Sequence, residues 1–221
     1  MGGIDVAAAE GKAGLNEFIE LPYRLCRNER HWVPPLRIAM KELLDRKKHP
    51  FYATADVEFF LARRDGEVVG RIAAILDKAY NRFHGEEAGH FGFFESIDDR
   101  AVAKALLDRA WEWLKGRGAK VMRGPVNPST NYECGLLIDG FDSDPMVMMP
   151  YNPSYYPELM DEAGLRKAKD LLAYYSTTEG VGTDKSERVA EKAIAAAGVT
   201  VRPIDMKNFN ADVERVWQVY N

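Results

Sequence analysis

The fold is decided by residues 57–76, which read VEFFLARRDGEVVGRIAAIL. Two runs rich in β-branched and aromatic residues, Val57–Arg63 and Val68–Leu76, flank the charged turn Arg64-Asp65-Gly66-Glu67. An Asp-Gly pair between such runs favours a tight turn, because glycine and aspartate tolerate the positive φ angles that the turn requires. The stretch therefore predicts a β-hairpin.

Further elements can be placed on both sides of the hairpin. Gly89–Ile97 is aromatic-rich and predicts a third long strand, and the helix after it carries one apolar stripe and ends at glycines. The order of elements indicates an α/β (α+β) domain over residues 1–176. The expected elements are strand Ile4–Ala8, helix Leu15–Arg27, which Pro22 would kink or restart, extended connector Trp32–Leu36, helix Arg37–Leu44, the hairpin, strand Gly89–Ile97, helix Arg100–Arg117, strand Ala119–Arg123, an irregular segment Gly124–Pro153, helix Tyr155–Ala163 and strand Lys169–Ser176.

The C-terminal part of the chain reads differently. Thr177–Thr183 is typical of a linker, and Ser186–Ala197 predicts an alanine-rich helix, so residues 177–198 are interpreted as linker and helix. Val199–Ile204 predicts a strand, and Phe209–Tyr220 a helix with apolar residues at spacings of three, four and seven. Strand then helix is also how the chain begins. Residues 199–221 are therefore either the start of a second, similar domain that is cut short or a strand and helix that dock on the first domain.

Composition excludes several classes of protein. The 221 residues include 30 Lys and Arg against 34 Asp and Glu, a net charge of −4, which argues against a general nucleic-acid binder but leaves a local basic groove open. The apolar runs Ile72–Leu76 and Pro145–Pro150 are far shorter than the ~20 residues of a membrane span. The start Met1–Asp5 lacks the features of a secretory leader. Cys26 and Cys134 form no disulfide framework, and neither they nor the four histidines show metal-ligand spacing, so we expect a cytoplasmic protein without a metal.

The order of elements and several local stretches resemble the GNAT acyltransferase superfamily. The resemblance covers about Ile4–Ser176 and implies a mixed, mostly antiparallel central sheet flanked by helices. Val68–Ala73 looks like the second hairpin strand of the superfamily, and Gly89–Leu107 looks like its central strand and cofactor-facing helix. Tyr151–Leu165 resembles its late helix. The shorter stretches Phe91–Glu95 and Met149–Pro153 look like a poorly characterised bacterial branch with GNAT-like domains.

The resemblance implies that acetyl-CoA or a longer acyl-CoA is the co-substrate. In this superfamily the pyrophosphate sits where the central strand turns into the helix, because a helix start offers unpaired N–H donors and a positive dipole end. The family pattern there, Gln/Arg-x-x-Gly-x-Gly/Ala, falls on residues 98–103, where Asp98 and Asp99 would compete with the pyrophosphate or simply cap the helix. A carrier-bound donor is the alternative. The expected cofactor-binding residues are Phe93, Phe94, Asp98, Asp99, Arg100, Ala101, Val102, Ala103 and Asn152.

Transfer of an acyl group to an amine needs a base for the amine, donors for the oxyanion and an acid for the leaving sulfur. Glu95 lies near the end of the central strand and is the predicted base, or else a surface charge. The superfamily's acid is commonly a tyrosine four residues before the late glycine, where this chain has Met160. Tyr155 and Tyr156 are therefore the candidate acids, with packing as the alternative role.

Residues 123–135 carry the predicted acceptor site. Asn127, Ser129, Asn131 and Glu133 cluster polar groups in a stretch rich in Gly and Pro, which suits a lid over a small-molecule amine. The alternative is a structured turn in which these side chains bond their own backbone.

The amino-acid sequence alone leaves two functions open. The first is an acyltransferase that moves an acyl group from a thioester to an amine. The second is a GNAT-like domain that has lost catalysis and binds a ligand or a protein. Asp98 and Met160, at positions where the family has working residues, favour the second.

Overall fold

The computed structural model describes residues 2–175, 177, 184–198 and 200–220. It divides into two compact units, Met1–Leu171 and Leu172–Asn221. The linker predicted over Thr177–Thr183 lies, apart from Thr177, outside the described residues.

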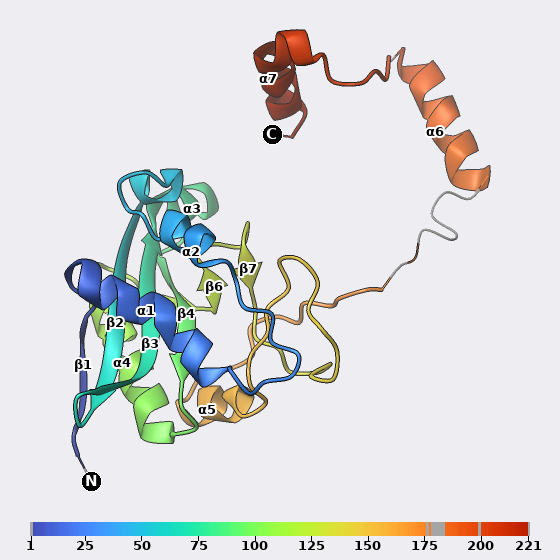
Figure 1. Cartoon of the computed structure of the whole chain (residues 1–221). Coiled ribbons are helices and arrows are strands. Elements are labelled where there is room, and N and C mark those ends of the chain that lie inside the picture. The colour runs from blue at the N-terminus through green and yellow to red at the C-terminus, as the bar shows by residue number, and fades with distance from the viewer. Residues whose placement is uncertain (1, 176, 178–183, 199, 221) are drawn as a thin grey trace. The chain divides into compact units, whose positions relative to one another are not determined.

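The first unit is built on a five-stranded sheet of order β1-β2-β3-β4-β5 (Figure 1). Adjacent strands from β1 to β4 are antiparallel, and β5 joins β4 in parallel. This arrangement, with helices packed on the sheet, confirms the expected fold class. The strands are β1 (Ile4–Ala8), β2 (Ala55–Arg64), β3 (Glu67–Asp77), β4 (Ala88–Ser96) and β5 (Val121–Arg123).

The predicted hairpin is formed by β2 and β3. Its turn residues Asp65 and Gly66 have φ angles of 51° and 83°, the positive values that the Asp-Gly pair predicts. β3 is buried along nearly its whole length, because the sheet is covered on both faces. A strand covered on both sides reads as a continuous apolar run, which is how residues 68–76 read apart from Arg71.

Helices cover the two faces of the sheet and create two cores. One core joins Phe60 and Ile72 to Leu106 of α4, and the other joins Phe59 and Ile75 to residues of α1. The helices of this unit are α1 (Gly11–Leu25), α2 (Arg37–Leu43), α3 (Lys78–His84), α4 (Arg100–Lys115) and α5 (Tyr156–Glu162), with a short 3-10 helix η1 (Pro50–Ala53).

The irregular segment after β5 contains a small second sheet. β6 (Val126–Asn127) pairs antiparallel with β7 (Glu133–Cys134). The peptide bonds before Pro125 and Pro128 are cis. β5 pairs with β4 only over Val121–Arg123, and the segment that follows returns to β4 through β6.

Three predictions for this unit need correction. Helix α1 begins at Gly11 instead of Leu15 and ends at Leu25 instead of Arg27, and it does not restart at Pro22, whose carbonyl accepts the amide of Cys26. Helix α3 was not expected; Asp77 caps it by accepting hydrogen bonds from the amides of Ala79 and Tyr80. Residues 169–175, predicted as a strand ending at Ser176, have no regular structure, and no described strand pairs with them; Ser176 itself is not described.

The second unit contains helices α6 (Asp184–Ala197) and α7 (Phe209–Tyr220) and a 3-10 helix η2 (Met206–Asn208). These two α-helices confirm the helices predicted at Ser186–Ala197 and Phe209–Tyr220. Residues 200–204 do not form the predicted strand, and Val199 is not described. Instead Arg202 makes two hydrogen bonds, of 2.7 and 2.5 Å, to Asp212 in α7, which also accepts the amide of Asp205 at 2.8 Å. That a second GNAT-like domain begins here stays a prediction.

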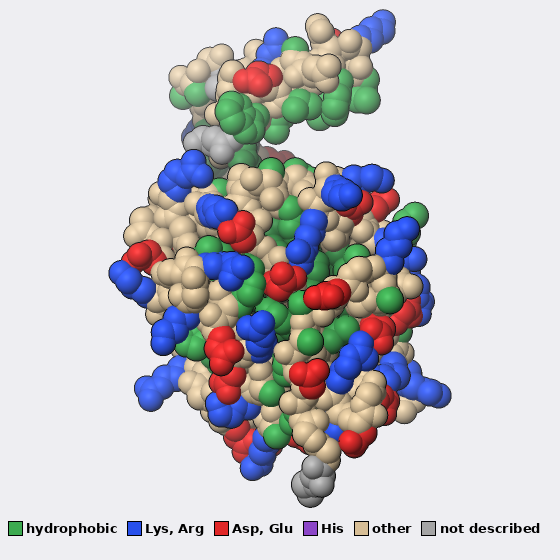
Figure 2. Space-filling view, turned by 90° about the vertical axis from the view of Figure 1, so that its left-hand side faces the viewer, with side chains coloured by type: hydrophobic (Ala, Val, Ile, Leu, Met, Phe, Trp, Pro, Cys, Tyr) green, Lys and Arg blue, Asp and Glu red, His purple; other side chains and the backbone are tan. Residues whose placement is uncertain are grey.

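Two surface properties bear on function. None of the described helices is long and apolar enough to cross a membrane. On the face shown in Figure 2, Lys and Arg side chains are interspersed with Asp and Glu. That face therefore carries mixed charge, as the small net charge of the chain leads one to expect.

Candidate functional site

A buried polar cluster joins β3, β4 and α5. The sheet register places Arg71 of β3 opposite Glu95 of β4, and Arg71 Nη2 lies 3.4 Å from Glu95 Oε1. Tyr156, the first residue of α5, donates from its hydroxyl to Glu95 Oε2 at 2.6 Å. The same hydroxyl oxygen accepts the amide of Ser96 at 3.1 Å. The predicted base and one predicted acid are thus in direct contact.

An irregularity in β4 helps to position Glu95. Between the pairs Arg71–Glu95 and Ala73–Gly92, β4 has one more residue than β3. Phe93 lies in this bulge with a φ of 48°, a conformation that is uncommon for residues other than glycine. Bulges re-aim side chains next to functional sites. Here the bulge precedes the residue that pairs with Arg71 and Tyr156.

The electrostatics of Glu95 suit a proton acceptor. Burial raises the pKa of its carboxyl, and the charge of Arg71 and the hydrogen bonds from Tyr156 and Arg71 only partly oppose this. The negative charge of Glu133 raises the pKa of Glu95 further. About a sixth of the Glu95 side chain, 17%, remains exposed. A carboxylate with a raised pKa is a stronger base than an ordinary glutamate.

The hydroxyls of the two candidate acids already donate hydrogen bonds within the chain. Tyr156 donates to Glu95, and Tyr155 donates to the backbone carbonyl of Ser96 at 2.9 Å. Burial raises the pKa of both hydroxyls, so both are protonated at neutral pH. Tyr156 is only 1% exposed and packs edge-on against Phe94. It therefore holds Glu95 in place, and a role of either tyrosine as acid stays a prediction.

The first turn of α4 is capped by the chain itself. Asp99 Oδ1 accepts the amides of Ala101 and Val102 at 2.8 and 3.2 Å, and its carbonyl accepts the amide of Ala103. Its other carboxylate oxygen bonds to Arg64 at 2.8 Å. Burial raises the pKa of Asp99, but these hydrogen bonds outweigh it and lower the pKa overall. A pyrophosphate on these amides would have to displace the Asp99 carboxylate.

This cap leads to a first prediction. Asp99→Ala should destabilise the first unit by about 0.5–2 kcal/mol, the usual cost of losing an N-cap side chain. Asp98→Ala is the matched control, because Asp98 precedes the cap and its side chain makes none of the cap's hydrogen bonds. Urea unfolding followed by circular dichroism measures both. Equal stabilities of the two variants would contradict the assignment of the cap to Asp99.

The outer edge of β4 is also occupied beyond its three pairs with β5. The amide of Phe93 donates to Asn127 Oδ1 at 2.6 Å, and β6 packs so closely that a Cβ on Gly92 would stand 1.6 Å from the carbonyl oxygen of Val126. Farther along β4, the amide of Ser96 donates a hydrogen bond to the hydroxyl of Tyr156. At these points β6 and α5 therefore fill the edge of β4.

The predicted acceptor segment is divided between two places. Asn127 pairs with Glu133 across β6 and β7, and burial raises the pKa of the Glu133 carboxyl, an effect that the Asn127 side chain partly opposes. The charge of Arg71 lowers the pKa of Glu133, and the negative charge of Glu133 raises the pKa of Glu95, so Glu133 is electrostatically coupled to the Arg71–Glu95 pair. Ser129 and Asn131 instead bond one another, the Asn131 amide to the Ser129 hydroxyl at 3.3 Å, as in the structured turn considered above.

The remaining predicted cofactor residues have structural contacts. Asn152 is buried and connects two segments of the chain. Its Oδ1 accepts the amide of Leu137, and its Nδ2 donates to the carbonyls of Leu137 and Pro153. Arg100 forms exposed ion pairs with Glu158 and Glu162 of α5. Their roles toward a cofactor stay predictions.

Sequence reasoning missed Arg71, the residue that completes the cluster. The sequence does contain an indication of its role, because Arg71 is the one charged residue inside the apolar run from Val68 to Leu76. Charged residues are almost never fully buried unless they are paired. A lone charge in a strand that is buried on both faces therefore indicates a partner on a neighbouring element.

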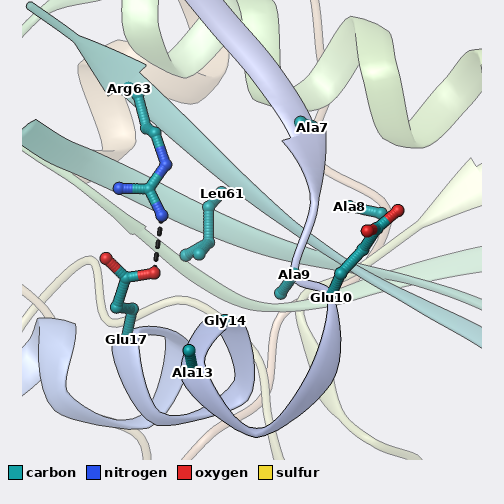
Figure 3. A pocket seen from close by; sticks show the side chains of 9 residues that line it. All are labelled: Ala7, Ala8, Ala9, Glu10, Ala13, Gly14, Glu17, Leu61 and Arg63. Carbon is teal, nitrogen blue, oxygen red and sulfur yellow. Dashed lines mark hydrogen bonds and ion pairs between the residues drawn. The ribbon is translucent and has the colours of Figure 1, made fainter. Parts of the chain in front are cut away.

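A hollow of about 450 Å³ lies elsewhere, between the end of β1, the start of α1 and β2 (Figure 3). Small side chains, including Ala9, Ala13 and Gly14, line it, and an ion pair of 2.5 Å between Arg63 and Glu17 closes one side. None of the predicted site residues lines it. Among the residues that the structure describes, no group of three or more His, Cys, Asp or Glu is placed to hold a metal.

The chain is similar in sequence to two curated bacterial proteins. It is 36% identical over 219 residues to the bacterial ceramide synthase of Caulobacter vibrioides, covering 99% of this chain and 57% of the relative. It is 34% identical over 213 residues to protein YghO of Escherichia coli, covering 95% of this chain and 53% of the relative. The chain thus spans little more than half the length of these relatives. No family model matches it.

Solved structures similar to the chain include acetyltransferases. A tandem GNAT protein from the clavulanic acid biosynthesis pathway is 14% identical, with a TM-score of 0.48 over 73% of this chain and 43% of that one. The aminoglycoside N-acetyltransferase AAC(6')-Iy in complex with CoA is 12% identical, with a TM-score of 0.46 over 80% and 96%.

Proposed function

We propose that this chain forms the GNAT-like part of an N-acyltransferase that moves an acyl group from a thioester to an amine. The observation that carries the proposal is Glu95, held between Arg71 and Tyr156 with a pKa above its ordinary range. The sequence similarity to a bacterial ceramide synthase supports the same reaction class. A ceramide is a long-chain amino alcohol whose nitrogen carries a fatty acyl group. The acceptor would then be a long-chain amine and the donor a long-chain acyl thioester.

In this mechanism Glu95 takes the proton from the acceptor ammonium, and the free amine attacks the thioester carbonyl carbon. The carbon–nitrogen bond forms, the carbon–sulfur bond breaks, and the nitrogen loses a second proton. The leaving sulfur takes up one proton to become a thiol, so of the two protons that the ammonium loses one is released to solvent. Glu133, whose negative charge raises the pKa of the same carboxyl, is the candidate to hold the incoming cationic amine. Tyr155 is a candidate donor of the proton to sulfur once its bond to Ser96 is broken.

The test is turnover with a matrix of thioesters and amines. Acetyl-CoA and palmitoyl-CoA are each offered with a short amine and with sphinganine, and the released thiol is measured by a colorimetric reagent. We expect turnover with palmitoyl-CoA and sphinganine. Thiol release that does not depend on the amine, or none with any pair, would contradict the proposal.

A second function is favoured by a different observation. The amides of Phe93, Ser96, Ala101 and Val102 are all bonded within the chain. A domain with these donors occupied would bind a ligand or a protein without catalysing transfer. Isothermal titration with CoA separates the two: saturable binding supports the transferase, and its absence together with absence of turnover supports the non-catalytic domain.

A further inference from the structure

Arg71 is a buried charge in the middle of the sheet. Only 5% of its side chain is exposed, and its neighbours Ile72 and Ala73 are fully buried. Its Nη1 donates to the backbone carbonyl of Phe18 in α1 at 2.5 Å, and the guanidinium carbon lies 4.8 Å from the centre of the Phe18 ring. Its Nη2 faces Glu95. One side chain thus connects α1, β3 and β4 at the candidate site.

Stability alone does not account for this residue. Its Nε is buried and is the one such side-chain nitrogen or oxygen without a hydrogen-bond partner in the described chain. An unpaired buried donor is costly, and buried ion pairs can often be replaced by apolar residues without loss of stability. The charge is better explained by its effect on Glu95.

Among the groups that face Glu95, one is a cation. They are Arg71 from β3, Tyr155 and Tyr156 from α5, Glu133 from β7 and Cys26 directly after α1. The tyrosines and the thiol are neutral, and Glu133 repels a second negative charge. Of this set, only Arg71 favours the ionised carboxylate by its charge.

We propose that Arg71 is a positioning residue for the transfer reaction, which holds the Glu95 carboxylate ionised and oriented and is itself fixed by the Phe18 carbonyl. This inference rests on the proposed function, in which Glu95 is the base. A neighbouring cation typically lowers a carboxyl pKa by about 1–3 units, so its removal should raise the pKa of Glu95 by a similar amount.

The test compares Arg71→Met, which removes the charge, with Arg71→Lys, which keeps it. In the pH profile of kcat/KM, the limb on which activity rises with pH reports deprotonation of Glu95. We expect Arg71→Met to move this limb upward by about 1–3 pH units and Arg71→Lys to leave it near the wild-type position. A purely structural role would lower activity at every pH without moving the limb, and that result would overturn the proposal.

A second measurement does not depend on turnover. Carboxyl-labelled glutamate is followed by NMR during a pH titration, with the Glu95 signal assigned from its loss in Glu95→Gln. Glu95 should titrate at higher pH in Arg71→Met than in wild type, whether or not the protein proves to be a transferase. Titration at the same pH in both would overturn the role of Arg71. If Arg71→Met does not fold, Arg71→Gln serves in its place.

Discussion

Glu95→Gln is expected to lower kcat/KM by about 10²–10⁴-fold, the usual contribution of a positioned general base. Glutamine keeps the size of the side chain and can still accept the hydrogen bond from Tyr156, but it cannot take a proton from the acceptor. The loss should appear in kcat, because the base acts in the transition state and not in substrate binding. Thiol release with the active pair of thioester and amine measures it.

The control is Glu112→Gln, since Glu112 is an exposed residue on α4 whose side chain is 71% accessible. Its activity should match that of wild type. The wild-type profile should rise with pH through a value above the ordinary glutamate pKa of about 4.3, because burial raises the pKa of Glu95. Full activity in Glu95→Gln would remove Glu95 from the mechanism while leaving the fold assignment intact.

Local sequence signals predicted most of the fold. The Asp-Gly turn sets the hairpin because it depends only on neighbouring residues, and the apolar stripe of α7 predicts its bounds, Phe209–Tyr220. The predicted strand at 169–176 failed for the opposite reason. A strand needs a partner for its backbone groups, and a single segment of sequence does not contain its partner.

The candidate site was predicted less completely, because it is made by contacts between distant residues. Glu95 was found from its place at the end of the central strand, but its contacts come from Arg71 and from Tyr156, which is 61 residues later. The cap by Asp99 was one of two interpretations of the same residues, and only the geometry of α4 decides that its amides are bonded. The amide oxygen of Asn127 bonds to β4, a contact that the sequence does not reveal, and the role of Asn127 toward the acceptor stays a prediction.

Gly92→Ala is expected to destabilise the first unit by at least about 1–3 kcal/mol, the usual cost of overpacking a filled interior. The added Cβ would stand 1.6 Å from the backbone oxygen of Val126 and 3.1 Å from Asn127 Oδ1. A backbone atom cannot rotate away as a flexible side chain can, so β6 must move off β4 and the hydrogen bond from Phe93 to Asn127 must break.

Gly3→Ala is the matched control, because nothing lies within 4 Å of a Cβ built there. It should change stability by no more than about 1 kcal/mol, through the entropy of the unfolded chain. Urea unfolding of both variants compares the two. Equal stability would mean that β6 does not press on β4 at Gly92. A large loss in Gly92→Ala alone means instead that a donor must displace β6, or enter elsewhere, before Glu95 can act on its acceptor.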